Sequence, residues 1–268
     1  MPQSVWLYDE GTAPTLCCDH VAGYLGATVA GIAPRCRSEF VTHWLAGSHD
    51  SAESLALRIA RLKVRNPAAP AVHVEPLAGE IAYEQRRLEN GNRGPFGVVY
   101  DGFRFQASVA RLLGGREADA IHVVFTNRLL ATWEPDDRRY HLRTIILAAP
   151  AIISTTGLVE APAKPREFYA ARRALGIPGG ADYEVLKQQF AGRFLDHDDL
   201  RLIEVAKGYA LQAVAYALTG EAFCDDPHCR LYNAHWQERM VEAQIGGRLC
   251  ERHQRILKDE HPHQAAGS

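Results

Sequence analysis

The residues best suited to chemistry are four potential metal ligands toward the C-terminal end. Four residues separate Cys224 from Cys229, and two separate Cys250 from His253. Two short-range pairs joined by a spacer of helical length are typical of a chain that wraps a tetrahedral Zn²⁺. Three thiolates and one imidazole fill the coordination shell. The pattern therefore predicts one structural zinc ion per chain, with no open position for water.

A simpler interpretation is that these cysteines are buried thiols that never meet, because free cysteine is a common core residue. His228 and His235 are spare candidate ligands. His235 falls in a predicted helix, Ala234–Gln244, where a packing or surface role is more common. The histidines of the closing HPH sequence, 261–263, are predicted to belong to a solvated tail.

The sequence around this cluster resembles the archaemetzincins, a family of zincin-type metallopeptidases. Their pattern is H-E-x-x-H-x-x-G-x-x-H-C, then x4-C-x-M, and further on C-x2-C. Cys224-x4-Cys229-x-Leu231 matches the middle of this pattern, with Leu for Met. Cys250-x2-His253 matches its end, with His for the last Cys and a slightly longer spacer. The resemblance covers residues 117–258, about half of the chain.

The resemblance implies a zincin-like mixed sheet with helices and a C-terminal zinc knuckle, but not the usual chemistry. In the family, three histidines hold the catalytic zinc and the glutamate is the general base. Aligned on the first knuckle cysteine, the histidine positions are Ala213, Ala217 and Phe223, and the glutamate position is Val214. None of these side chains can bind a metal or take a proton. Gly220 keeps the family's glycine, as expected for a left-handed helix end.

Four carboxylates are weak candidates for a relocated catalytic centre. Asp9 and Glu10 follow one predicted strand, and Asp101 follows another, in the similar sequences VWLYDE and GVVYDG. The carboxyl ends of strands are where α/β sheets bind ligands. The simpler interpretation is that such an Asp caps the next helix. The fourth candidate, Glu204, is three residues before Lys207 on a predicted helix, so an exposed ion pair is the favoured interpretation.

Other polar groups give weaker signals. His122 and His141 lie on predicted strands that we expect to be neighbours, an arrangement in which the two side chains can face each other. Glu80 and Glu84 are one helical turn apart, which is typical of a solvated face. Ser154-Thr155-Thr156-Gly157 is a hydroxyl-rich turn suited to an anion or an extended peptide. Cys17 and Cys18 are adjacent on a predicted helix and point in different directions, which makes a shared metal site awkward.

The alternation of elements predicts an α/β fold. In the first part, the predicted strands are Ser4–Tyr8 and Thr28–Ile32, and the predicted helices are Thr15–Leu25, Arg37–Leu45, Ser51–Leu62 and Gly79–Leu88. The loop Asn90–Gly97 separates an N-terminal α/β extension, residues 1–95, from the archaemetzincin-like region, residues 96–268.

After this loop the strand and helix pattern starts again. A hairpin is predicted around Pro135, because strand-like runs flank Pro-Asp-Asp. The helix Asp198–Leu218 is apolar on nearly every face, as expected for a buried helix. The other predicted strands are Gly97–Tyr100, Ile121–Thr126 and Ala151–Ser154, and the other helices are Phe103–Leu113, Arg166–Leu175 and Tyr183–Phe190.

Composition narrows the function classes. The 268 residues are 47% hydrophobic and 23% charged, as in ordinary globular proteins. The formal charge of -2 disfavours nucleic-acid binding. A zinc-knuckle nucleic-acid module therefore ranks low, despite the basic residues Arg248, Arg252, Arg255 and Lys258. No run is apolar and long enough to span a membrane, and no signal peptide is evident, which predicts a cytoplasmic protein.

Two functional hypotheses remain. The first is a zinc-binding, archaemetzincin-like protein without the catalytic zinc, a pseudo-peptidase that binds a peptide or a protein partner. The alternative is an active enzyme, a hydrolase or another class, with relocated catalytic residues. The sequence predicts no substrate and no oligomeric state.

Overall fold

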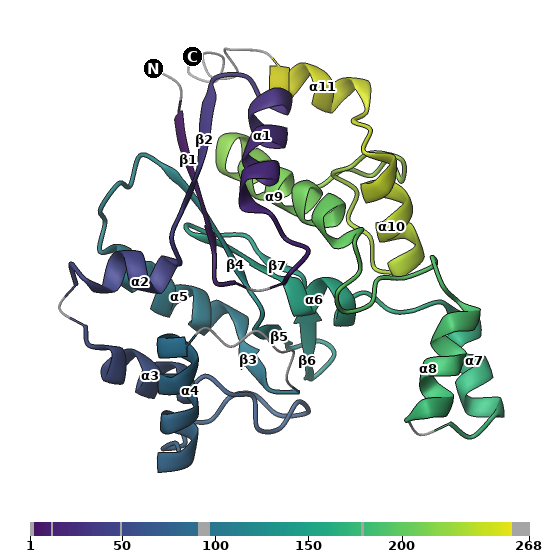
Figure 1. Ribbon diagram of the computed structural model, residues 1–268, viewed down its shortest axis with the longest axis horizontal. Helices are drawn as coiled ribbons and strands as arrows, with labels where there is room; N and C mark the ends of the chain where they lie inside the picture. Colours follow the sequence, from purple (N-terminus) through teal and green to yellow (C-terminus); the bar gives the residue numbers. More distant parts are fainter. Residues whose placement is uncertain (1–2, 12, 49, 91–96, 178–179, 259–268) are drawn as a thin grey trace.

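The computed structural model describes residues 3–11, 13–48, 50–90, 97–177 and 180–258 (Figure 1). These residues form a mixed α/β structure with two sheets. Among them, no helix combines the length and the apolar character needed to cross a membrane. The predicted tail histidines at 261–263 and most of the predicted loop at 90–97 lie outside the described residues.

The larger sheet has five strands in the order β2-β1-β4-β8-β7. Four of them are parallel, and only the short edge strand β7 runs antiparallel to its neighbour. Every residue of β4 is buried, because helices cover both faces of the sheet. The strands are β1 (Gln3–Asp9), β2 (Ile32–Arg37), β4 (Ile121–Thr126), β7 (Ile145–Ile146) and β8 (Ala151–Ser154).

The two faces of this sheet bury different cores. Along β1, alternation sends Leu7 to one core and Tyr8 to the other. The first core lies against α1 (Cys18–Thr28) and α9 (Leu202–Thr219), and it buries most of α9, as the sequence predicts. The second core lies against α2 (Phe40–Leu45), α3 (Ala52–Ala60) and α5 (Gly102–Leu113).

The smaller sheet has the order β3-β5-β6 and lies beside the second core (Figure 1). Its strands β5 (Leu129–Glu134) and β6 (Arg139–Arg143) form the predicted antiparallel hairpin, and β3 (Val99–Asp101) is parallel to β5. Helix α4 (Ala78–Asn90) packs against α3 at the same end of the molecule.

The remaining helices follow the sheets in the chain. A pair of them, α7 and α8, projects from the rest of the structure (Figure 1) around its own aromatic cluster, centred on Phe168. These helices are α6 (Thr155–Glu160), α7 (Arg166–Ala174), α8 (Ala181–Gln189), α10 (Gln237–Gly246) and α11 (Glu251–Lys258).

Strands from both sides of residue 95 share the larger sheet. β1 and β2 precede that position, whereas β4, β7 and β8 follow it, and β1 pairs directly with β4. The N-terminal residues therefore extend this sheet. The proposed boundary at residue 95 itself lies among residues that the structure does not describe.

Two N-terminal elements differ from their predictions. The second strand is Ile32–Arg37 instead of Thr28–Ile32, because α1 continues to Thr28 and Gly31 makes a turn with a φ of +72°. The predicted helix Arg37–Leu45 begins only at Phe40. The reason is that β2 is an edge strand with half-buried residues, so its polar sequence does not show the apolar pattern of a strand.

A buried Tyr–His pair joins β1 to β4 in the second core. The Tyr8 hydroxyl lies 2.9 Å from His122 Nδ1 and accepts from Trp44 Nε1 and from Arg37. His122 Nε2 lies 3.1 Å from the Glu117 carbonyl oxygen, which favours a proton on Nε2 and leaves Nδ1 as the acceptor for the tyrosine. Burial lowers the pKa of His122, and Arg37 and His43 lower it further, against the opposing effect of Glu117.

This pair predicts a loss of stability in acid. A histidine whose folded-state pKa lies below its unfolded value makes its full contribution above about pH 6.5, and loses it as the pH falls below that value. We expect the free energy of unfolding of the parent to fall between pH 7.5 and 5 by more than that of His122→Gln. Urea unfolding of both proteins at the two pH values measures this difference. An equal fall in both proteins would contradict the assignment.

Candidate metal centre

The first two potential ligands lie on a tight knuckle after α9. Cys224 N donates to the Leu231 carbonyl at 2.9 Å, and Cys229 N donates to the Asp226 carbonyl at 3.0 Å. The Asp226 side chain accepts from His228 N, which closes an Asx turn between the two cysteines. The knuckle therefore folds back so that its two thiols are presented on one side.

The other two potential ligands are at the start of α11. Cys250 immediately precedes this helix and His253 is in its first turn, so the helix places both side chains on the same side. The knuckle and this segment are joined directly, since Arg230 N donates to the Arg248 carbonyl at 2.7 Å. Cys229 and His253 are buried, and Cys224 and Cys250 are half-buried.

The structure brings all four side chains together, with their ligand atoms within 4.8 Å of one another. We call these residues the Cys3His group. Cys224 Sγ lies 3.9 Å from Cys250 Sγ, and His253 Nδ1 lies 3.1 Å from Cys250 Sγ and 3.7 Å from Cys229 Sγ. A tetrahedron of ligands about 2.3 Å from a zinc ion has edges of about 3.8 Å. The arrangement thus fits a zinc ion, with Nδ1 as the histidine donor.

The three thiols of the Cys3His group have pKa values that are shifted in different directions. Burial raises the pKa values of the Cys224 and Cys229 thiols. Burial acts the same way on Cys250, but hydrogen bonds from the backbone at the start of α11 and from the other thiols outweigh it and lower its pKa. A divalent cation removes this conflict, because it stabilises thiolates that are otherwise costly to bury.

Helix α9 supplies no metal ligand at the positions where a zincin would need one. Ala213 and Val214 are buried in the first core, whereas Ala217 is exposed and Phe223 is 40% exposed. The helix ends as predicted, at Gly220 with a φ of +77°. Among the described residues, the Cys3His group is the one set of three or more His, Cys, Asp or Glu side chains with metal-binding geometry.

The four candidate catalytic carboxylates do not come together. Asp9 and Glu10 lie at the carboxyl end of β1, in the larger sheet. Asp101 is in the smaller sheet, where it caps α5 by accepting from Arg104 N and also accepts from the Tyr140 hydroxyl. Glu204 lies 2.6 Å from Lys207 Nζ on α9 and pairs also with Arg230. The simpler interpretations hold for Asp101, which caps a helix, and for Glu204, which forms an ion pair.

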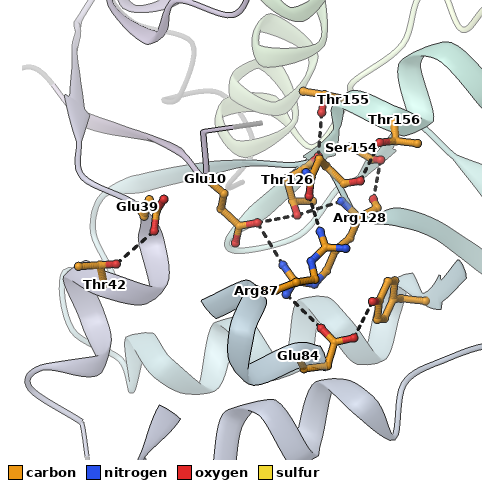
Figure 2. A network of polar contacts seen from close by, with 12 residues as sticks. Glu10, Glu39, Thr42, Glu84, Arg87, Thr126, Arg128, Ser154, Thr155 and Thr156 are labelled. Atoms are coloured by element: carbon orange, nitrogen blue, oxygen red, sulfur yellow. Dashed lines mark hydrogen bonds and ion pairs between the residues drawn. The ribbon is translucent and has the colours of Figure 1, made fainter. Parts of the chain in front are cut away.

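Glu10 belongs to a buried ionic network at the carboxyl edge of the larger sheet (Figure 2). This network is the feature that best fits an enzyme with relocated catalytic residues. Arg128 follows β4 and is only 3% exposed. Its guanidinium lies 3.2 Å from Glu10 and 3.3 Å from Glu84, which is fully buried on α4. Lys63 Nζ, at 3.3 Å, and the Tyr100 hydroxyl, at 2.7 Å, complete the surroundings of Glu84.

This network corrects the prediction that Glu80 and Glu84 share a solvated face. Glu80 pairs with Arg65 near the surface, but Glu84 points into the molecule. Sequence reasoning also missed Arg128 and Arg87, which is 7% exposed and donates to the Asn127 side chain. Asn127 and Arg128 directly follow the predicted strand Ile121–Thr126, and the carboxyl end of a strand is where α/β sheets bind ligands, so their position could have identified them. A cavity of about 20 Å³ lies beside Glu10, Arg87 and Arg128.

Two weaker predictions are also resolved by the topology. His122 and His141 do not face each other, because β4 belongs to the larger sheet and β6 to the smaller one. The hydroxyls of the Ser154–Thr156 turn are used internally. Ser154 Oγ caps α6 and donates to the Arg128 carbonyl, and both threonines donate to carbonyls of the β4–β5 connection.

A cleft of about 330 Å³ lies between the edge of the sheets and the knuckle. Its lining includes the chain from His141 to Ile145, Tyr209 of α9, Phe223 and the segment 233–235. The spare candidate ligand His235 is exposed here, away from the Cys3His group.

The fold and the site define a mixed α/β protein with a C-terminal Cys3His group suited to zinc. The chain belongs to the probable metallopeptidase family DUF6775, whose model matches residues 1–260. A crystal structure of a zinc-dependent peptidase from Methanocorpusculum labreanum is similar to it, with 13% identity and a TM-score of 0.45. That similarity covers 94% of this chain and 99% of the other. No curated protein matches the chain.

The Cys3His group predicts that Cys229→Ala removes the zinc and severely destabilises the C-terminal part. Structural zinc contributes on the order of 10 kcal/mol of apparent binding free energy. Elemental analysis and thermal unfolding of the purified proteins measure both effects. Cys17→Ala, which removes a cysteine outside the group, is expected to keep one zinc per chain and to unfold near the parent temperature. A Cys229→Ala protein with its zinc and its stability intact would refute the ligand assignment.

The ionic network predicts a large effect at Glu84. Glu84→Gln removes the carboxylate that faces both Lys63 and Arg128, and breaking a buried ion pair costs about 3–5 kcal/mol. Glu89→Gln, on the exposed face of the same helix, should change the free energy of unfolding by no more than about 0.5 kcal/mol. Chemical denaturation of the two variants compares them. Similar small effects at both positions would show that Glu84 is solvated after all.

Proposed function

We propose that the chain is a zinc-containing pseudo-peptidase, in which the metal is structural and the cleft binds a peptide or a protein segment. The proposal rests mainly on the Cys3His group. A complete set of four ligands leaves no coordination position for an activated water molecule. Peptide hydrolysis by zinc requires such an open position.

The archaemetzincin resemblance supports the proposal from a second direction. In that alignment the catalytic ligands fall on Ala213, Ala217 and Phe223, and the general base falls on Val214. Val214 is fully buried among apolar side chains of the first core, so it has no access to a substrate. A second zinc would need ligands other than these side chains.

The cleft offers two features that favour an extended peptide. Strand β7 is the last strand in the order of the larger sheet, so its outer edge can pair with an added strand. Phe223 supplies an exposed aromatic surface in the lining of the cleft, where a peptide side chain could pack. Main-chain pairing with β7 and an apolar contact with Phe223 are enough to bind a peptide without catalysis.

An active enzyme with relocated catalytic residues is the second candidate. The observation in its favour is the cavity beside Glu10 and Arg128, because it lies between the ends of β1 and β4. In the larger sheet, β2 lies on one side of β1 and β4 lies on the other, so the order of the strands reverses at β1. The ligands of α/β sheets bind at such a reversal of strand order. Two metal ions per chain, one of them surviving Cys229→Ala, would favour this alternative.

A pool of casein peptides tests the proposed function. We expect the protein to retain a subset of these peptides during size-exclusion chromatography and to leave their masses unchanged. Phe223→Ala should reduce the retained amount about tenfold, since burial of an aromatic ring typically contributes more than 1.4 kcal/mol.

The matched control is Tyr216→Ala, which removes an aromatic side chain with the same exposure, 39%, from α9 outside the cleft lining. It should retain peptides as the parent does. Cleavage of the peptides by the metal-replete parent would overturn the pseudo-peptidase proposal, and equal losses in both variants would remove the cleft from it.

A further inference from the structure

We propose that a second cavity, next to the smaller sheet, binds a small organic acid with an apolar body. The cavity has a volume of about 180 Å³ and shares no lining residue with the cleft or with the Cys3His group. One part of its lining is cationic and the other is apolar. We call it the basic cavity. Its cationic side chains are Arg61, Lys63, Arg65 and Arg104.

The cationic side is held in place by the smaller sheet. Val64 N donates to the Val99 carbonyl at 2.8 Å, and Asp101 N donates to the Leu62 carbonyl at 2.8 Å, so the segment after α3 runs along β3. Arg104 lies in the first turn of α5, directly after β3. The four cations thus project from two short, hydrogen-bonded parts of the chain and not from a free loop.

The charges of the basic cavity are only partly compensated. Among the described residues, no carboxylate lines the cavity. Arg104 has no carboxylate within ion-pair distance in the described part of the chain, whereas each of the other three cations pairs with a glutamate outside the lining. These pairs are Arg61–Glu75 at 2.8 Å, Lys63–Glu84 at 3.3 Å and Arg65–Glu80 at 2.7 Å. The field in the cavity therefore favours an anion.

The Asp101 carboxylate, which contacts Tyr140 of the lining, is already engaged. Asp101 accepts from the Tyr140 hydroxyl at 3.0 Å and from Arg104 N at 3.1 Å, so its charge faces the start of α5. Burial, together with Asp101, raises the pKa of Tyr140 to about 12, so this hydroxyl is neutral at physiological pH. Asp101 therefore does not form an ion pair with the Arg104 side chain.

The apolar side of the basic cavity is formed by valines that are exposed to solvent. Val72 is 72% exposed and Val74 is 39% exposed, in a segment without helix or strand. The chain before this segment is joined to β6, because Tyr140 N donates to the Pro67 carbonyl at 2.8 Å. Val72 and Val74 leave apolar surface open to a ligand in the cavity.

Together these features specify an amphipathic anion. Arg104 is exposed and has no carboxylate partner among the described residues, so its guanidinium can pair with a ligand carboxylate, and the valines provide apolar contacts for the rest of the ligand. A volume of about 180 Å³ is below the range of pockets for drug-sized ligands, so the ligand is small. The proposal concerns a site separate from the peptide cleft and does not depend on the proposed function.

Three probes of related structure test it, with isothermal titration calorimetry on the zinc-containing protein. Octanoate has both features, octylammonium keeps the apolar chain with the opposite charge, and propionate keeps the carboxylate with a minimal chain. We expect saturable binding of one octanoate per chain, and at least tenfold weaker binding of the other two. Equal binding of octanoate and octylammonium, or no saturable binding of octanoate, would overturn the proposal.

Two variants and one control locate the site. Arg104→Gln should weaken octanoate binding about tenfold, since a hydrogen-bonded charge pair typically contributes 1.5 kcal/mol or more. Val72→Asp should weaken it at least as much, because it places a like charge in the apolar wall. Arg35→Gln makes the same charge change on β2, in the other sheet, and should leave the affinity unchanged. Unchanged binding in Arg104→Gln would place the ligand elsewhere and refute the assignment.

Discussion

Arg128 is a charge that has almost no contact with water, and several parts of the fold meet around it. Its guanidinium contacts Glu10 at the end of β1 and Glu84 on α4, and its own backbone follows β4. A buried cation of this kind is tolerated only when carboxylates lie beside it. The positions of α4 and of the start of the smaller sheet therefore depend on this contact, because Glu84 also holds Lys63 and Tyr100.

The C-terminal part depends on a different constraint. Helix α9 is mostly buried, but the chain that follows it buries few apolar side chains and forms short helices. The Cys3His group compensates for this by joining the knuckle to the start of α11. Cys229, Leu231 and Leu257 are also members of the first core, so a metal in this group would connect directly to the packing of α9.

The two centres are suited to different chemistry. The Cys3His group offers four ligands and is partly buried, which suits a structural metal. The carboxyl edge of the larger sheet has ionic groups and a small cavity, yet Glu10 is held by Thr126 and Arg128 and the nearby hydroxyls bond to the backbone. Most of the polar groups there are used to stabilise the fold. The cleft, at about 330 Å³, and the basic cavity, at about 180 Å³, leave more room for a ligand.

The sequence by itself determined the features that depend on neighbours in the chain. The knuckle spacing of Cys224 and Cys229, the end of α9 at Gly220 and the capping of α5 by Asp101 are all local, and so is the hairpin at Pro135. Each of these features depends on backbone geometry within a few residues, so residue types and their spacing are enough to predict it. The mixed α/β class followed from the same local alternation.

Only the tertiary structure decided which distant residues meet. Glu80 and Glu84 look equivalent in the sequence, but the direction of α4 against the sheet makes one an exposed partner of Arg65 and the other a buried partner of Arg128. His122 and His141 look like neighbours, but their strands belong to different sheets. The approach of Cys250 and His253 to the knuckle is also a tertiary contact. The packing of helices against sheets sets these distances. This packing depends on the burial of whole helix and sheet faces, and a short segment of the sequence does not include a whole face.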